Sequence, residues 1–159
     1  MAELMELTEL HKVLQDYAKD VTDRYKDVLA NNGHIASKDL VNSIKTEVKV
    51  GDAAYEVTMT LKDYWKYVEN DTRPHFPPPS ALIRWIEVKP VIPRPMANGK
   101  LPTTKQLAYL IGRKIATEGT TGTHDLEKTK TDIFSWYKDR LSEALGHDVS
   151  NYIRKVMAR

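Results

Sequence analysis

Histidine gives this chain its widest choice of chemistry, because imidazole binds metals and exchanges a proton near neutral pH. The five histidines are His11, His34, His75, His124 and His147. No two have the spacing of a ligand pair on one helix, and no acidic cluster accompanies them. His11 falls on the apolar stripe of an expected helix, where a core or boundary imidazole is favoured over a metal ligand. The histidines therefore predict no metal site and no cofactor.

The sequence also lacks the motifs for thiol, serine-nucleophile and phosphate-loop chemistry. The chain has no cysteine, which excludes disulfides, thiolate ligands and thiol nucleophiles. No Gly-x-Ser-x-Gly elbow occurs, and no glycine-rich phosphate loop, because the glycines are isolated, as at Gly33, Gly51, Gly99 and Gly112. We expect no catalytic residue and no enzyme.

Carboxylates are the one reactive type present in quantity, with 22 acidic residues. A glycosidase needs two of them across the scissile bond. Glu69 and Asp71 flank an aromatic cluster, but turn formation, or pairing with Arg73, is the favoured interpretation of both. No motif supports a wall-degrading hydrolase with dispersed carboxylates.

The composition is that of a soluble globular protein, with 41% hydrophobic and 29% charged residues. At 159 residues we expect one hydrophobic core and a single domain over 1–159. The formal charge of +2 does not favour nucleic-acid binding by the whole surface. The acidic start lacks the features of a secretory signal, and no run of about 18 apolar residues occurs, so we expect no membrane partner.

One segment departs from this charge balance. Between Val88 and Thr117 there are six basic residues and no acidic one. The basic residues are Lys89, Arg94, Lys100, Lys105, Arg113 and Lys114. A solvated face is the favoured interpretation. An acidic neighbouring subunit or the DNA backbone are the alternatives, since both are attracted through screened electrostatics.

The elements that would carry these residues begin with a long N-terminal helix. Apolar residues recur three and four apart, at Leu4, Leu7, His11, Leu14, Ala18, Val21, Tyr25 and Val28. The helix should end near Asn31–Gly33, where Asn and Gly tolerate a left-handed cap. A core-facing helix is favoured over a partner-binding coiled coil. Alternating residues at 44–50 and 55–61 then predict an antiparallel β-hairpin around Gly51–Asp52.

The middle of the chain is dominated by proline. All eight prolines lie between Pro74 and Pro102, directly after an aromatic cluster at 64–68. Pro77–Pro79 should be extended, and Ser80 should cap a short helix over 80–87 buried through Leu82, Ile83, Trp85 and Ile86. The remainder is predicted to form a stiff, proline-rich arm within about 70–104.

Two helices complete an α+β fold. Thr103 or Thr104 should cap the first, whose apolar stripe is Leu107, Leu110, Ile111 and Ile115 and whose end is bracketed by Gly119 and Gly122. The second should run from Thr131 to the C-terminus, with Gly146 as a point of bending or breakage. Its stripe is Phe134, Tyr137, Leu141, Leu145, Val149, Tyr152 and Val156.

Several of these stretches carry a resemblance. Residues 67–75 (YVENDTRPH) are followed by Pro77–Pro79 and by residues 82–86 (LIRWI). Residues 107–115 (LAYLIGRKI) precede Glu118-Gly119-Thr120, and residues 37–44 read SKDLVNSI. Together they resemble a pattern in the minor tail and neck proteins of tailed double-stranded DNA bacteriophages, a group of head–tail connector and tail-completion proteins.

The resemblance implies a structural virion protein, made in the host bacterial cytoplasm, whose copies form an oligomeric ring at the head–tail junction or upper tail. Its implied partners are other copies of itself and portal, adaptor or tail-tube proteins, around the path of the DNA. A small DNA-associated accessory protein, binding through the basic 88–117 segment, is the alternative.

A stiff arm suits such assembly, because its unbound ensemble is already narrow and ordering it against a neighbour costs little entropy. We therefore predict Trp65, Tyr67 and Trp85 at the base of the arm and a basic surface of Lys89, Lys100, Lys105, Arg113 and Lys114. The predicted intersubunit contacts are Phe76, Pro77, Pro78, Pro79, Val91, Ile92, Pro93, Arg94, Pro95 and Met96.

Overall fold

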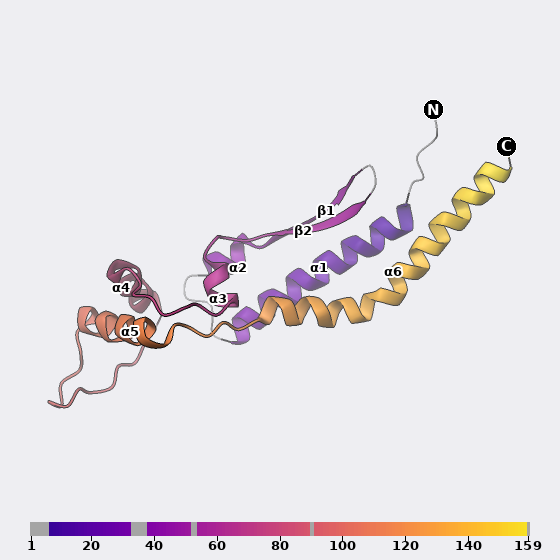
Figure 1. Cartoon of the computed structure of the whole chain (residues 1–159). Helices are drawn as coiled ribbons and strands as arrows, with labels where there is room; N and C mark the ends of the chain where they lie inside the picture. The colour runs from indigo at the N-terminus through magenta and orange to yellow at the C-terminus, as the bar shows by residue number, and fades with distance from the viewer. Residues whose placement is uncertain (1–6, 33–37, 52–53, 90, 159) are drawn as a thin grey trace. The chain divides into compact units, whose positions relative to one another are not determined.

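The computed structural model describes residues 7–32, 38–51, 54–89 and 91–158, and it confirms the α+β class. Figure 1 shows the elements. In chain order they are α1 (Thr8–Asn31), α2 (Asp39–Ser43), β1 (Lys45–Val50), β2 (Tyr55–Thr60), α3 (Trp65–Glu69), α4 (Pro79–Val88), α5 (Thr104–Glu118) and α6 (Asp125–Met157). The long N-terminal helix, the antiparallel hairpin and the two C-terminal helices are those that the sequence predicts.

The contacts within the chain group its residues into two compact units. Unit 1 consists of Met1–Leu29, Ser43–Leu61 and Asp125–Arg159, and unit 2 of Ala30–Asn42 and Lys62–His124. Unit 1 therefore contains α1, the hairpin and α6, whereas unit 2 contains α3, α4, α5 and the proline-rich loops. No helix within the described residues is long and apolar enough to cross a membrane.

The core of unit 1 lies between α1, α6 and the hairpin (Figure 1). Val21, Ile133 and Tyr137 are buried at its centre, and Met59 of β2 packs against them. β1 and β2 pair antiparallel from Lys45↔Thr60 to Val50↔Tyr55. The hydroxyls of Thr22 and Thr46 lie 2.5 Å apart, which ties α1 to β1. The first helix thus needs a sheet and a second helix to cover its stripe.

Helix α6 differs from its prediction at both its start and its buried face. It begins at Asp125, six residues before Thr131, because Leu126, Thr129 and Ile133 continue the buried face and acidic residues suit a helix N-terminus. Gly146 does not break it, since the hydrogen-bonded helix runs on to Met157. Of the predicted stripe, Phe134, Leu145 and Val156 are exposed. Small and polar residues, Ala144 and Asp148, are buried in their place.

Asp148 has a structural role that explains its burial. Its carboxylate accepts hydrogen bonds from the backbone N–H groups of Glu9 (3.1 Å) and Leu10 (2.9 Å). These groups lie in the first turn of α1, where backbone donors lack partners within the helix. A side chain of α6 therefore caps α1 from outside it, and the negative charge lies at the positive end of the helix dipole.

Unit 2 is closed at its base by a backbone clamp between residues 68–72 and 119–124. Thr72 and Thr120 form an antiparallel bridge, and their hydroxyl oxygens lie 2.7 Å apart. The N–H of His124 donates to the carbonyl of Glu69 (3.1 Å). Gly119 adopts a φ of 75°, and a Cβ there would lie 2.1 Å from the Thr72 carbonyl oxygen. Only glycine fits this approach, and it ends α5 as the sequence predicts.

The start of α4 differs from its prediction. Pro79 is the first helical residue and Pro78 the N-cap, so Ser80 lies inside the helix and is not its cap. Proline is tolerated here because the first helical N–H has no partner within the helix. Of its predicted buried residues, Leu82 is buried, Ile83 and Ile86 are half-buried, and Trp85 is exposed.

Helix α5 begins with a complete capping box. The Thr103 hydroxyl accepts from the Gln106 N–H (3.3 Å), and the Gln106 side chain accepts from the Thr103 N–H (2.9 Å). Its buried residues are Ala108 and Gly112, whereas Leu110, predicted for the apolar stripe, is exposed. Two small residues one turn apart let neighbouring groups approach the α5 backbone closely, which rotates the buried face away from Leu110.

Candidate interaction surface

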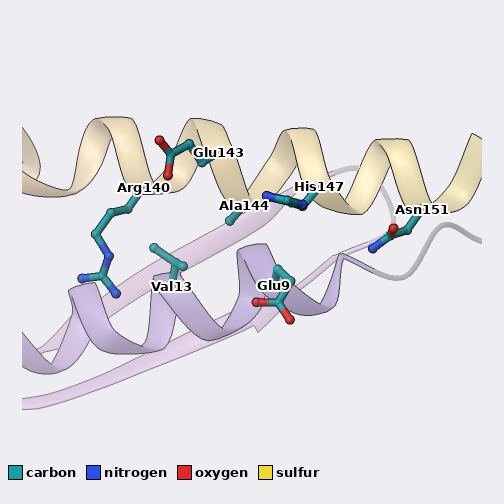
Figure 2. Close-up of a pocket in the computed structure, with 7 residues that line it drawn as sticks. All are labelled: Glu9, Val13, Arg140, Glu143, Ala144, His147 and Asn151. Carbon is teal, nitrogen blue, oxygen red and sulfur yellow. The ribbon is translucent and has the colours of Figure 1, made fainter.

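Unit 1 has an open groove of about 400 Å³ between α1 and α6 (Figure 2). Five of its seven lining residues are polar or charged, and the lining comes from one face of each helix. The lining residues are Glu9, Val13, Arg140, Glu143, Ala144, His147 and Asn151.

The polar groups of this groove do not converge on a common point. Arg140 is already engaged, because its guanidinium donates to Asp16 at 3.2 Å and lies 4.7 Å from the centroid of the Tyr137 ring. In Figure 2 the carboxylates of Glu9 and Glu143 do not point toward one another. Among the described residues no group of three or more His, Asp or Glu side chains is placed to hold a metal ion.

Three of the histidines make structural contacts. The His11 ring lies 6.0 Å from the Tyr55 ring and its Nε2 is 3.0 Å from Gln15 Nε2. His75 Nδ1 is 2.8 Å from the carbonyl oxygen of Arg73. His124 Nε2 is 3.7 Å from an Asp71 oxygen. His147 lines the groove, and His34 lies outside the described residues.

Glu69 and Asp71 both belong to the clamp of unit 2. Glu69 is buried, and its carbonyl accepts the His124 N–H. The Asp71 carboxylate accepts the Gly122 N–H at 2.8 Å. The partner of the Asp71 carboxylate is thus a backbone N–H 51 residues away along the chain, which is neither a local turn nor a pairing with Arg73.

The first group of predicted contact residues is brought against α5. The Phe76 and Tyr109 rings have centroids 6.1 Å apart, and both side chains are exposed. The Phe76 ring also covers Gly112, since a Cβ at Gly112 would lie 2.9 Å from it. Pro77 is half-buried, and Pro78 and Pro79 begin α4. Phe76 and Tyr109 together form one exposed aromatic patch on unit 2.

The second group lies in the loop between α4 and α5, which extends away from both helices (Figure 1). Its end is a hydrogen-bonded turn, with Met96 N–H to Lys100 O (2.9 Å) and Gly99 N–H to Met96 O (2.8 Å). Ile92 is 91% exposed. Arg94 and Pro95 are also exposed, whereas Val91, Pro93 and Met96 are half-buried. We call residues 89–103 the arm.

The predicted arm-base residues are spread over two helices. Trp65 and Tyr67 belong to α3, where Trp65 is half-buried and Tyr67 is exposed. Trp85 belongs to α4, and Lys89 Nζ lies 5.2 Å from the centroid of its ring. Lys89, at the start of the arm, is thereby held against the Trp85 face by a cation–π contact.

The predicted basic surface divides between the arm and α5. Lys100 is exposed beside the turn of the arm, and Lys105, Arg113 and Lys114 are exposed on α5. Lys114 Nζ lies 3.8 Å from Glu118. Within the described part of the chain, Lys100, Lys105 and Arg113 form no ion pair. Unpaired cations beside exposed aromatic groups make α5 and the arm the candidate interaction surface.

Two features of this arrangement are invisible to sequence reasoning. Nothing in the sequence marks Asp148 as the cap of a helix that lies 138 residues away. The proximity of Tyr109 to Phe76 also depends on how α5 packs. The spacing of Gly119 and Gly122 indicates a helix end in the sequence, but not the close approach of both glycines to the backbone of residues 69–73.

No family model matches the chain, and neither a search of curated proteins nor one of solved structures gives a match.

Proposed function

We propose that this chain is a non-enzymatic structural protein of a tailed bacteriophage virion, a subunit that assembles into a ring in the neck or upper tail. The ring would join portal or adaptor proteins to the tail and surround the DNA passage. The assignment to the virion rests on the resemblance in residues 37–44, 67–86 and 107–120. The assignment to assembly rests on the surface of unit 2.

The observation that carries the assembly role is the exposure of large apolar side chains on the arm and α5. Ile92 and Leu101 of the arm are exposed, as are Tyr109 and Leu110 of α5. Single exposed apolar residues are ordinary on a monomer. Four of them on two neighbouring segments of the chain, with Phe76 in contact with Tyr109 and with exposed cations on the same segments, are typical of a surface that binds another protein.

The clamp supports the same role. The segment 73–118 is closed at its base by the Thr72–Thr120 bridge, and its arm ends in a hydrogen-bonded turn. Prolines at 93, 95 and 102 restrict the backbone between these fixed points. Binding a neighbour through such an arm costs little conformational entropy.

Deleting residues 91–100 tests the proposal. We expect a folded protein, by circular dichroism and cooperative unfolding, that no longer assembles in light scattering and electron microscopy. The matched control replaces Val50, an exposed apolar residue of unit 1, by serine and should assemble normally. Normal assembly of the deletion variant would contradict the role of the arm. Flanking genes for portal, capsid and tail proteins would support the virion assignment, and their absence would oppose it.

DNA binding is the second candidate, favoured by the exposed cations of α5 and the arm. A phosphate-binding surface would give an affinity that falls steeply with salt concentration. Charge reversal at Lys105, Arg113 and Lys114 should then weaken binding to duplex DNA. Negligible affinity at low salt would remove this candidate.

A further inference from the structure

The α5 surface has a defined arrangement of charge around an apolar centre. Tyr109, 58% exposed, and Leu110 lie on the solvent-facing side of the helix with Arg113. Lys105 and Lys114 lie on either side of them at helical spacing. We call these five residues the α5 face. A partner for it needs an exposed apolar group within an acidic rim.

Unit 1 of the same chain carries an acidic rim of this kind on α1. Aspartates at 16, 20, 23 and 27 are spaced four, three and four residues apart, so they form one stripe along the exposed side of the helix. Asp16 pairs with Arg140, and Asp20 accepts the Tyr137 hydroxyl. Within the described residues, Asp23 and Asp27 form no ion pair. Lys19 and Arg24 are exposed cations adjacent in sequence to this stripe.

The same side of unit 1 also has an exposed aromatic side chain, that of Trp136. Trp136 is 66% exposed and lies one turn of α6 from Arg140. Because Arg140 donates to Asp16, Trp136 lies on the flank of α6 that adjoins the acidic stripe. Trp136 and the four aspartates form what we call the α1 face. Its exposed aromatic side chain and its acidic stripe complement the apolar and the basic residues of the α5 face.

The net charges of the two units support the same pairing. Unit 2 has 11 basic and 6 acidic residues, a formal charge of +5, whereas unit 1 has 13 basic and 16 acidic residues, a formal charge of −3. Two copies of one chain therefore attract through unlike units and repel through like units.

We infer that the α5 face of one copy binds the α1 face of the next copy. The contact is heterologous, because a different patch is used on each side, and repeated contacts of this kind close into rings when the rotation allows it. Tyr109, Arg113 and Trp136 belong to the residue types that carry most of the energy at interfaces. This inference rests on the proposed function and names the surfaces through which its ring is built.

A charge-swap experiment tests the pairing. One variant carries Arg113→Glu and Lys114→Glu, and the other carries Asp23→Lys and Asp27→Lys. Each alone should self-associate roughly tenfold more weakly or worse in sedimentation velocity at low salt. Mixing the two variants, or combining all four substitutions in one chain, should restore association. The matched control is Lys130→Glu with Arg154→Glu, which reverses two exposed cations of α6 outside both faces.

The outcomes separate this inference from the function on which it rests. A wild type that stays monomeric at every concentration would overturn both. A wild type that assembles while both variants also assemble, or while the mixture fails to recover, would overturn the pairing and leave the ring. If the monomer is compact at every protein concentration, the α5 face and the α1 face of the same chain bind each other. If reversal on α5 abolished DNA binding and left self-association unchanged, the face would be a DNA surface.

Discussion

Thr72 and Thr120 are 48 residues apart in the chain, yet their hydroxyl oxygens lie 2.7 Å apart and the N–H of Thr72 donates to the carbonyl of Thr120 at 2.8 Å. This pair closes a segment that contains α4, the arm and α5. Bringing the ends of a long segment together costs conformational entropy. Once the Thr72–Thr120 pair has formed, the two ends of this segment are fixed while α4 and α5 pack. The bridge closes the segment from which the arm extends.

Gly119→Ala should open this clamp. The added Cβ would lie 2.1 Å from the Thr72 carbonyl oxygen, and a backbone with φ of 75° and ψ of −160° is essentially restricted to glycine. We expect unit 2 to lose about 3 kcal/mol or more of its free energy of unfolding. Urea unfolding in a Trp136→Phe background measures this, because Trp65 and Trp85 then report on unit 2 alone.

Gly99→Ala is the control for that prediction. Gly99 has the same φ of 75°, but a Cβ there would meet nothing within 4 Å. The cost should therefore be limited to backbone strain, about 1 to 2 kcal/mol. If Gly99→Ala and Gly119→Ala lower the free energy of unfolding equally, the close approach of Gly119 to Thr72 is not the reason why glycine is needed at position 119.

Gly146→Ala should stabilise unit 1. The residue lies in the middle of α6, is exposed, and has space for a methyl group. Alanine is better than glycine in a helix interior by about 1 kcal/mol, so the free energy of unfolding should rise by that amount. Chemical denaturation followed by Trp136 emission, with Trp65 and Trp85 replaced by phenylalanine, measures it. A loss of stability would mean that α6 needs flexibility at this point.

Asp148→Ala should destabilise unit 1 by about 1 to 2 kcal/mol, because two N–H groups at the start of α1 lose a charged acceptor. Asp148→Asn keeps one acceptor oxygen without the charge, so its free energy of unfolding should lie between those of the wild type and Asp148→Ala. The same Trp136 measurement applies. Asp139→Ala, at an exposed position of the same helix, should change stability little. Equal effects at Asp139 and Asp148 would contradict the capping role.

The sequence predicts the elements of this fold well where its periodicity is strong. The stripe of α1 from Ala18 to Tyr25 is buried as expected, and the hairpin pairs in one regular register. The face of α6 was predicted wrongly for a physical reason. Hydrophobic size marked Phe134 and Leu145, but the packing against α1 favours the small Ala144 and the capping Asp148.

The candidate surface was predictable only in part. The density of prolines predicts the arm from the sequence, because proline restricts the backbone locally and independently of tertiary contacts. Which apolar side chains remain exposed is a tertiary property. Leu110 belongs to an apolar helical stripe in the sequence, yet it faces solvent because Ala108 and Gly112 form the contact side of α5. The α1 face requires α1 and α6 to be adjacent, and no local pattern specifies that.

Tyr137 should make the stability of unit 1 depend on alkaline pH. Burial raises the pKa of Tyr137, and the hydrogen bond of its hydroxyl to Asp20 (2.5 Å) raises this pKa further, against a smaller opposite effect of Arg140. Burial also raises the pKa of Tyr17. The unfolded chain releases these protons near pH 10, before the folded protein does. The stabilisation is therefore complete below about pH 10 and is lost as the pH rises through the folded-state pKa.

Tyr137→Phe isolates that contribution. Near pH 7 it should cost about 1 kcal/mol for the lost hydrogen bond, because Asp20 is exposed and regains water as its partner. Between about pH 9 and pH 11 the variant should lose less stability than the wild type, and Tyr17 should account for part of the remaining loss. Urea unfolding across this range measures both slopes. Identical slopes would show that the Tyr137 hydroxyl titrates at the same pH in the folded and unfolded chains, and that its burial against α1 does not hold the proton.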